Sequence, residues 1–289
     1  MKAVVVDRYG PPEVLRIEDV DRPILKEREV LVMVHATTVT RSDAMGVRGV
    51  EYRFTRLFTG IRRPRRKTFG SEFAGHIVEV GPRVEAFQVG DEVYGMQVGA
   101  NAESVAVSES GVIALKPRSL TYEEATAIPD GSLLALTCLR PAELRRKRVL
   151  VYGAGGSVGC AAVQLLAHHF EAEVTAVCDT KSLEVVRSLG AREVIDRLNE
   201  DFTTRATAYD VIFDAVGRTS FRRCRGSLAP GGSYVTMDLG FMYHVPLLAL
   251  ATRVTRVLGS KHAKVGVGRY RQDDLLFVSD LVKRGDYGP

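Results

Sequence analysis

Between residues 153 and 159 the chain reads Gly153-Ala154-Gly155-Gly156-Ser157-Val158-Gly159, and this run follows directly on the apolar residues 149–152. An unbroken apolar run is typical of a parallel strand that is covered on both faces. Within residues 158–165 the apolar side chains recur at the spacing of one helix face. The stretch therefore predicts a strand, a tight turn and a helix, which is the unit from which parallel sheets are built.

The same glycine run fits the fingerprint of a dinucleotide-binding turn, with Ala154, Gly156 and Gly159 at its three small positions. Small residues are needed because the backbone must turn tightly, approach a pyrophosphate closely and let the helix pack on the strand. Ser157 and Val158 open the helix, whose free N–H groups attract phosphate. A tight turn without a ligand is the alternative; the strand–turn–helix context favours dinucleotide binding.

An acidic residue follows at the distance that the fingerprint requires. Asp179 ends the next apolar run, 20 residues after Gly159, where a carboxylate meets the adenosine ribose. A carboxylate there repels a 2′-phosphate and so favours NAD(H). Lys181 and Ser182 are close enough to offer compensating contacts, and Asp179 as a helix N-cap suits either cofactor. We therefore expect NAD(P)H, with NAD(H) favoured.

The pattern of apolar runs and turn residues changes near residue 118. Before it, short apolar runs alternate with Gly and Pro turns, as in an irregular β-barrel; after it, strand-like and helix-like runs alternate. The length of 289 residues allows two domains with cores of their own. We expect an α/β protein with a barrel domain over 1–117, a doubly wound parallel-sheet domain over 118–268, and over 269–289 the start of a return to the first domain, cut short.

Composition narrows the class of protein. The chain is 45% hydrophobic and carries a net charge of +5, so it is not a disordered chain, and an anionic ligand is compatible with it. The four cysteines are far apart, which favours a reducing cytoplasm over a disulfide framework. The apolar run 245–251 is far below the ~20 residues of a membrane span. No membrane partner is expected.

The order of these motifs is similar to that of the medium-chain dehydrogenase/reductase superfamily, and within it to the zinc-free quinone oxidoreductase-like and enoyl-reductase-like branch. The resemblance covers nearly the whole chain and rests on residues 1–4, 70–81, 90–95, 153–159, 161–164 and 214–217. It implies a GroES-like β-barrel that carries the substrate site, followed by a Rossmann domain, with the reaction in the cleft between them. It also implies that Ala215, Val216 and Gly217 line the nicotinamide side.

The resemblance also bears on metal. Zinc-dependent relatives place a cysteine where this chain has Thr40, a histidine where it has Ser71, and a third ligand near Asp130. Hydroxyls are poor zinc ligands beside thiolate and imidazole, so we expect no metal. Without a Lewis acid to stabilise an alkoxide, hydride transfer to a quinone or an α,β-unsaturated carbonyl is the more accessible reaction. The expected protein is a zinc-independent NAD(P)H-dependent oxidoreductase.

The reduced substrate oxygen needs hydrogen-bond donors and a proton. The segment that matches the family's cleft loop offers Thr40 and Asp43, and Tyr52 is the nearest phenol downstream; these three are the candidate catalytic residues. Each also has a structural interpretation. Asp43 fits a helix N-cap or a turn residue, and Tyr52 fits a packing residue.

Seven basic residues fall within residues 53–67, interleaved with aromatic ones. A solvated loop is the favoured interpretation; a rim for phosphorylated or acyl-carrier substrates and a nucleic-acid patch are the alternatives. The basic segment also motivates one alternative function, a non-catalytic nucleotide-binding sensor or RNA-associated protein. A zinc-free alcohol dehydrogenase is kept as a further alternative. The expected partner is a small quinone or enone rather than nucleic acid, and edge-strand pairing is compatible with a homodimer.

Overall fold

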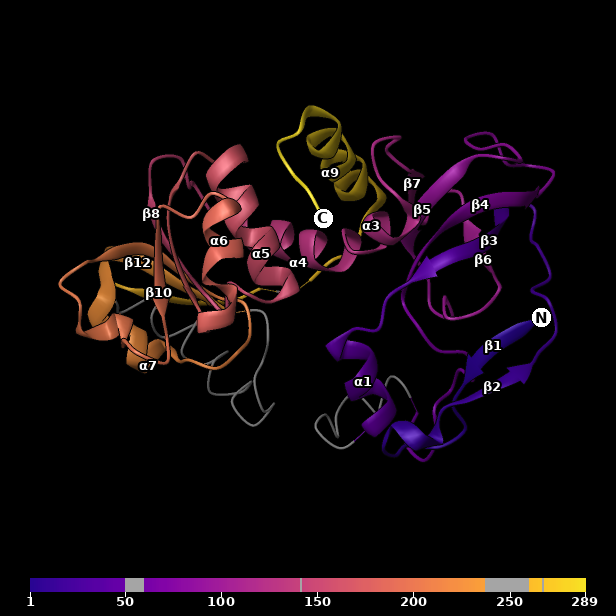
Figure 1. Ribbon diagram of the computed structural model, residues 1–289, viewed down its shortest axis with the longest axis horizontal. Helices are drawn as coiled ribbons and strands as arrows, with labels where there is room; N and C mark the ends of the chain where they lie inside the picture. Colours follow the sequence, from indigo (N-terminus) through magenta and orange to yellow (C-terminus); the bar gives the residue numbers. More distant parts are fainter. Residues whose placement is uncertain (50–59, 141, 237–259, 267) are drawn as a thin grey trace. The chain divides into compact units, whose positions relative to one another are not determined.

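The computed structural model describes residues 1–49, 60–140, 142–236, 260–266 and 268–289, which form two compact units (Figure 1). The first unit comprises Met1–Pro129 and Arg271–Lys283, together with Pro289. The second comprises Asp130–Tyr270 and Arg284–Gly288. Each unit has its own sheet and its own buried apolar cluster.

An antiparallel sheet in the order β6-β3-β4-β5-β7 forms the body of the first unit. Alternation along β3 and β6 buries Val30, Val32, Val105 and Val107 in one cluster. A separate pair, β1 and β2, is antiparallel as well. The elements of this unit are β1 (Lys2–Val5), β2 (Arg16–Asp19), β3 (Glu29–Thr37), α1 (Arg41–Arg48), β4 (Glu72–Val80), β5 (Glu92–Met96), β6 (Ser104–Ser108), β7 (Val112–Leu115), α3 (Tyr122–Thr126) and α9 (Gln272–Arg284).

Helix α9 joins the first unit although it lies at the far end of the chain. Its apolar side chains at Leu275, Val278 and Leu281 are buried. The side-chain amide of Gln272 donates to the carbonyl oxygens of Glu109 and Ile113, at 2.8 and 3.0 Å. Apolar burial and these two hydrogen bonds fix α9 beside β7.

The second unit is built on a six-stranded sheet in the order β10-β9-β8-β11-β12-β13, and every pair in it is parallel. Helix α5 packs on β8, and helix α6 packs on β9 and β10 (Figure 1). The elements are α4 (Pro129–Leu139), β8 (Arg148–Tyr152), α5 (Ser157–Gln164), β9 (Glu173–Cys178), α6 (Leu183–Ser188), β10 (Glu193–Asp196), β11 (Tyr209–Asp214), α7 (Phe221–Cys224), β12 (Leu228–Thr236) and β13 (His262–Val265).

This strand order is that of the Rossmann fold, because the chain moves outward from β8 to β10 and then returns to place β11 on the other side of β8. The predicted α/β class with a doubly wound parallel sheet is confirmed. Within the part of the chain that the structure describes, no helix is both long and apolar enough to cross a membrane.

Candidate functional site

The strand order reverses between β8 and β11, and ligands of open α/β sheets bind at the carboxyl ends of the strands beside such a point. The turn after β8 and the loop after β11 meet there. A Cβ added to Gly153 would lie 2.7 Å from the Cγ1 and Cγ2 atoms of Val216, and Gly153 has a φ of +83°. Both facts require glycine at 153. The sequence analysis assigned no role to Gly153, because it lies outside the three small positions Ala154, Gly156 and Gly159.

The two glycines of the fingerprint serve different purposes. A Cβ on Gly159 would stand 2.2 Å from the carbonyl oxygen of Gly153 and 2.7 Å from the Cα of Ala154, so the absence of a side chain lets α5 pack on the turn. A Cβ on Gly156, the N-cap of α5, would meet no atom closer than the Gly153 oxygen at 3.6 Å. Gly156 therefore leaves a free approach to the helix N-terminus.

A pyrophosphate fits this N-terminus. The first N–H groups of a helix have no intrahelical partner and carry a partial positive charge. Ser157 and Val158 supply those groups in α5. A Cβ on Gly156 would fill part of the open space beside this N-terminus. Ala154, by contrast, is fully buried, and its carbonyl oxygen accepts a hydrogen bond from the Cys160 thiol at 3.2 Å.

The loop after β11 is organised by a buried carboxylate. Asp214 is fully buried, and its Oδ1 accepts from the backbone N–H groups of Val216 (3.2 Å) and Gly217 (2.9 Å). Its Oδ2 accepts from the N–H of Thr219 (3.0 Å) and the hydroxyl of Tyr234 (2.9 Å). Burial raises the pKa of Tyr234, and the neighbouring Asp214 carboxylate raises it further.

Asp214 thus sets the conformation of the segment that is expected to line the nicotinamide side. Sequence reasoning quoted Asp214 as part of a family motif but gave it no role. The available signal was an acidic residue at the end of an apolar strand, followed by Ala215, Val216 and Gly217.

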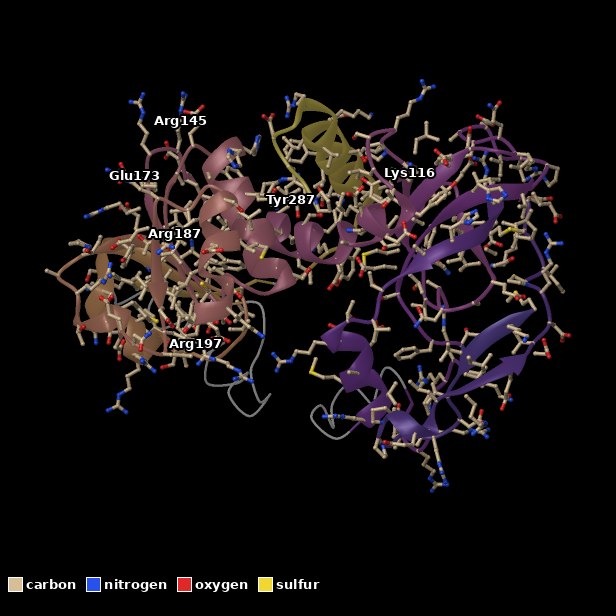
Figure 2. The ribbon with its side chains drawn as sticks, viewed as in Figure 1. Lys116, Arg145, Glu173, Arg187, Arg197 and Tyr287 are labelled. Atoms are coloured by element: carbon tan, nitrogen blue, oxygen red, sulfur yellow. The ribbon has the colours of Figure 1, made fainter. Side chains whose placement is uncertain are left out.

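The carboxylate after β9 has a partner that sequence reasoning missed. Asp179 is partly exposed, and its Oδ1 accepts a hydrogen bond from the Nε of Arg197, which follows β10 and is labelled in Figure 2. The bond to Asp179 is the main cause that raises the pKa of Arg197. Lys181 is exposed in the turn that follows Asp179. A Cβ on Gly155 would lie 2.5 Å from the Ser182 hydroxyl, so this turn packs on the glycine run.

In the first unit, Thr40 and Asp43 form a reciprocal cap at the start of α1. The Thr40 hydroxyl donates to Asp43 Oδ2 at 2.8 Å and accepts from the Asp43 N–H at 3.1 Å. The Thr40 N–H donates to the same Oδ2 at 2.9 Å, and the Ser71 hydroxyl donates to Asp43 Oδ1 at 3.4 Å. The structural interpretation of both residues is therefore visible, with Thr40 rather than Asp43 as the N-cap. Their catalytic role stays a prediction, and Tyr52 lies outside the described residues.

Among the residues with described positions, no group of three His, Cys, Asp or Glu side chains is arranged to hold a metal ion. Asp130, at the expected third position, accepts a hydrogen bond from the Tyr270 hydroxyl at 2.6 Å.

Comparisons with known proteins agree with this arrangement. A model of the alcohol dehydrogenase GroES-like domain matches residues 26–135, and a model of the zinc-binding dehydrogenase family matches residues 157–275. A quinone oxidoreductase from Coxiella burnetii has the same fold, with a TM-score of 0.82 at 25% identity; the match covers 99% of this chain and 88% of that one.

Two curated relatives are similar in sequence. The human mitochondrial NAD(P)H oxidoreductase RTN4IP1 is 32% identical, over 91% of this chain and 73% of its own length. A 2-methylene-furan-3-one reductase from Solanum lycopersicum is 35% identical over 75% of this chain, and the match spans only 58% of that enzyme's length.

Proposed function

Because this chain belongs to the medium-chain dehydrogenase/reductase superfamily, we propose that it transfers hydride from NAD(P)H to a quinone or an α,β-unsaturated carbonyl compound. The observation that carries the proposal is the open approach above Gly156 at the N-terminus of α5. The names of the relatives support the substrate class, since a 2-methylene-furan-3-one is a conjugated enone. The second unit would bind the cofactor and the first the substrate.

The residues of the second unit have separate tasks in this proposal. The N–H groups of Ser157 and Val158 bind the pyrophosphate, and Asp179 meets the adenosine ribose. Asp214 keeps Val216 and Gly217 in place beside the nicotinamide. The bound nicotinamide supplies the hydride.

In the first unit, Thr40 is the proposed donor to the substrate oxygen, and Asp43 is a positioning residue. The Thr40 hydroxyl hydrogen goes to Asp43 in the present arrangement, so it must turn to the substrate oxygen when negative charge develops there. We expect Thr40→Val to lower kcat by at least about tenfold and to destabilise the fold by about 1 kcal/mol through loss of the cap. Thr40→Ser should retain both. A loss of stability in Thr40→Val with unchanged kcat would contradict the catalytic role.

We propose that this reaction proceeds without zinc, on the chemistry of the donor set. The hydroxyls of Thr40 and Ser71 stand at the two positions where the resemblance places thiolate and imidazole ligands, and both are hydrogen-bonded to Asp43. The purified protein is expected to retain full activity after dialysis against a chelator. Stoichiometric zinc, whose removal abolishes turnover and whose return restores it, would overturn this part of the proposal.

The pair of Asp179 and Arg197 bears on the choice between NADH and NADPH. A free carboxylate repels a 2′-phosphate, but here a guanidinium is bound to it, and an arginine beside the ribose accommodates that phosphate. We propose that both cofactors are accepted and that Arg197 supports NADPH. Arg197→Ser should raise the KM for NADPH about tenfold and leave that for NADH nearly unchanged. Equal effects on the two cofactors would reduce the pair to a structural role.

The activity itself is tested by steady-state oxidation of NADH and NADPH by the full chain with a panel of quinones and enones, and by identification of the reduced product. Turnover of at least one enone with hydride at its β-carbon is the expected result. Calorimetric binding of cofactor without turnover of any acceptor would favour the non-catalytic sensor. Oxidation of simple alcohols alone would favour the alcohol dehydrogenase.

Location and assembly stay predictions. The four cysteines are free thiols, which suits a reducing compartment. We propose a cytoplasmic location on that ground; a relative is named as mitochondrial. Fluorescence microscopy of the tagged full chain and light scattering would test the location and the homodimer.

A further inference from the structure

A cluster of cations lies in the first unit, whereas the residues assigned to the cofactor belong to the second unit. It consists of five basic residues within six positions, and all five side chains are exposed: Arg62, Arg63, Arg65, Arg66 and Lys67. Among the described residues none of the five forms an ion pair. Elsewhere in this unit Arg16 pairs with Asp7, Arg28 with Glu109 and Arg83 with Glu27. Within the described part of the chain, the cluster is therefore a local excess of positive charge.

The loop that carries the cluster is held in one shape. The Tyr9 hydroxyl donates a hydrogen bond to the carbonyl oxygen of Gly60 at 2.6 Å. The backbone N–H of Val6 donates to the carbonyl oxygen of Lys67 at 2.8 Å. Gly60 has a φ of +125°, and a Cβ on it would stand 1.9 Å from the Arg63 oxygen. The backbone thus turns back on itself at a position where a side chain does not fit. Fixed ends and a fixed turn keep the cations close together despite their mutual repulsion.

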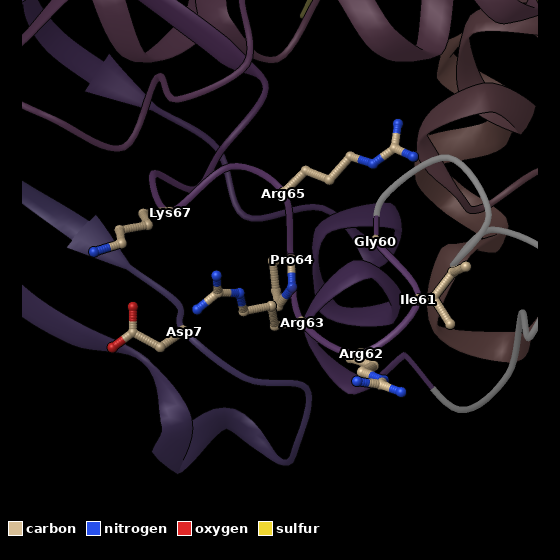
Figure 3. Close-up of a pocket in the computed structure, with 8 residues that line it drawn as sticks. All are labelled: Asp7, Gly60, Ile61, Arg62, Arg63, Pro64, Arg65 and Lys67. Carbon is tan, nitrogen blue, oxygen red and sulfur yellow. The ribbon is translucent and has the colours of Figure 1, made fainter.

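The loop borders a cavity of about 860 Å³. Figure 3 shows that the side chains of Arg63 and Lys67 extend toward the side on which Asp7 lies, whereas Arg62 and Arg65 extend elsewhere from the loop. All four line the cavity, and so do Asp7, Gly60, Ile61 and Pro64. Asp7, the acidic member of this set, is already bound to Arg16. Arg66 is not among the lining residues.

We propose that this cavity is a second anion site, which binds the phosphate group of a small phosphorylated ligand. Guanidinium groups bind phosphate through two parallel hydrogen bonds, and a concave surface of one sign concentrates the opposite charge. A nucleic-acid strand is a poorer match, because single-stranded binding relies on aromatic platforms and no described lining residue is aromatic. The site does not depend on the proposed hydride transfer.

The cavity lining offers a matched control within one loop. Arg63→Ser, Arg65→Ser and Arg66→Ser each remove one exposed charge, but only the first two alter the cavity. Inorganic pyrophosphate is titrated calorimetrically into the full chain at low salt, with saturating NADP⁺ present so that the N-terminus of α5 is occupied. We expect Arg63→Ser and Arg65→Ser to weaken pyrophosphate binding about tenfold each, as for loss of one charge-assisted hydrogen bond, and Arg66→Ser to change it less than twofold.

Two results of the pyrophosphate titration would overturn the proposal. One is an equal loss in all three variants, which would show a diffuse field rather than a site; the other is no pyrophosphate binding by the unaltered chain once NADP⁺ is bound. Titration with an oligouridylate distinguishes a phosphate site from a nucleic-acid surface. Tight RNA binding that Arg66→Ser weakens as much as Arg63→Ser would make the loop a nucleic-acid surface. Thermal melting of each variant checks that the fold is intact.

Discussion

At the scale of single residues, Gly156 and Gly159 lie three positions apart in one turn, and a side chain is excluded at each for a different reason. The missing Cβ of Gly159 prevents a collision within the protein itself, with Gly153 and Ala154. The missing Cβ of Gly156 prevents none, since its backbone is extended, with φ of −94° and ψ of 166°, and its surroundings are open. Under the proposed function, a Cβ at 156 would obstruct the bound pyrophosphate rather than the protein itself.

Alanine substitution should separate these two reasons. Gly159→Ala is expected to lower the free energy of unfolding by about 1–3 kcal/mol, because α5 must shift away from the turn. Gly156→Ala should leave that free energy within about 1 kcal/mol but weaken NAD(P)H binding by at least about tenfold. Urea unfolding and calorimetry measure the two quantities. If Gly156→Ala bound cofactor as well as the parent, the pyrophosphate would have to lie elsewhere.

At the scale of elements, the loop after β11 depends on one side chain. The Asp214 carboxylate accepts hydrogen bonds from three backbone N–H groups and one phenol hydroxyl. It thus supplies the acceptors that a neighbouring strand would supply in a sheet. A carboxylate is acceptor-only when ionised and can satisfy all four donors at once. The shape of residues 215–219 is therefore encoded by Asp214 more than by the loop residues themselves.

We expect Asp214→Asn to be costly although it preserves size. The amide presents N–H groups to donors that need an acceptor, and a buried unsatisfied donor costs about 1–3 kcal/mol. Urea unfolding should show a loss of about 2–4 kcal/mol, and cofactor binding should weaken as the loop loses its shape. Tyr234→Phe removes one donor only and should cost about 1 kcal/mol. Equal costs for the two variants would disprove the acceptor role.

At the scale of the whole molecule, the first unit includes a segment that follows the second unit in the sequence. Leu281 on α9 is buried, whereas Leu276 on the same helix is 46% exposed. The Tyr94 hydroxyl of β5 is 2.6 Å from the Ser279 hydroxyl of α9, which ties a central strand to the returning helix. The stability of the first unit therefore depends on residues that follow the second.

Truncation of the buried leucine should show this dependence. Leu281→Ala is expected to cost about 2–5 kcal/mol and Leu276→Ala close to nothing. Amide hydrogen exchange, read by peptide, should locate the loss of protection in residues 72–115 rather than in β8–β13. Uniform loss over both units would indicate that they unfold as one.

The hydrogen bond between Tyr94 of β5 and Ser279 of α9 also makes the free energy of unfolding depend on pH. Burial raises the pKa of Tyr94 to about 12, with the Asp280 charge adding and the Ser279 hydrogen bond opposing. The unfolded phenol titrates near pH 10. The folded state holds the proton longer, so this contribution is complete below about pH 10 and is lost as the pH rises toward 12. Urea unfolding of Tyr94→Phe should show a shallower alkaline decline than the parent; an identical slope would rule this contribution out.

The local order of residue types was enough to predict the elements of the second unit and the kind of site they form. Residues 149–165 specify strand, turn and helix by spacing alone, and the alternation after residue 118 specifies the parallel sheet, because such periodicities report which face of each element is buried. Asp179 at the end of its strand could be placed for the same reason.

Only the tertiary structure decided which distant side chains meet. Arg197 reaches Asp179 because β10 pairs with β9, and Gln272 reaches the β7 region because α9 packs there. Gly153 needs its glycine because of Val216, which belongs to another strand's loop. Such pairs arise from strand register and long-range packing, which are properties of the folded chain and leave no spacing signal in the sequence.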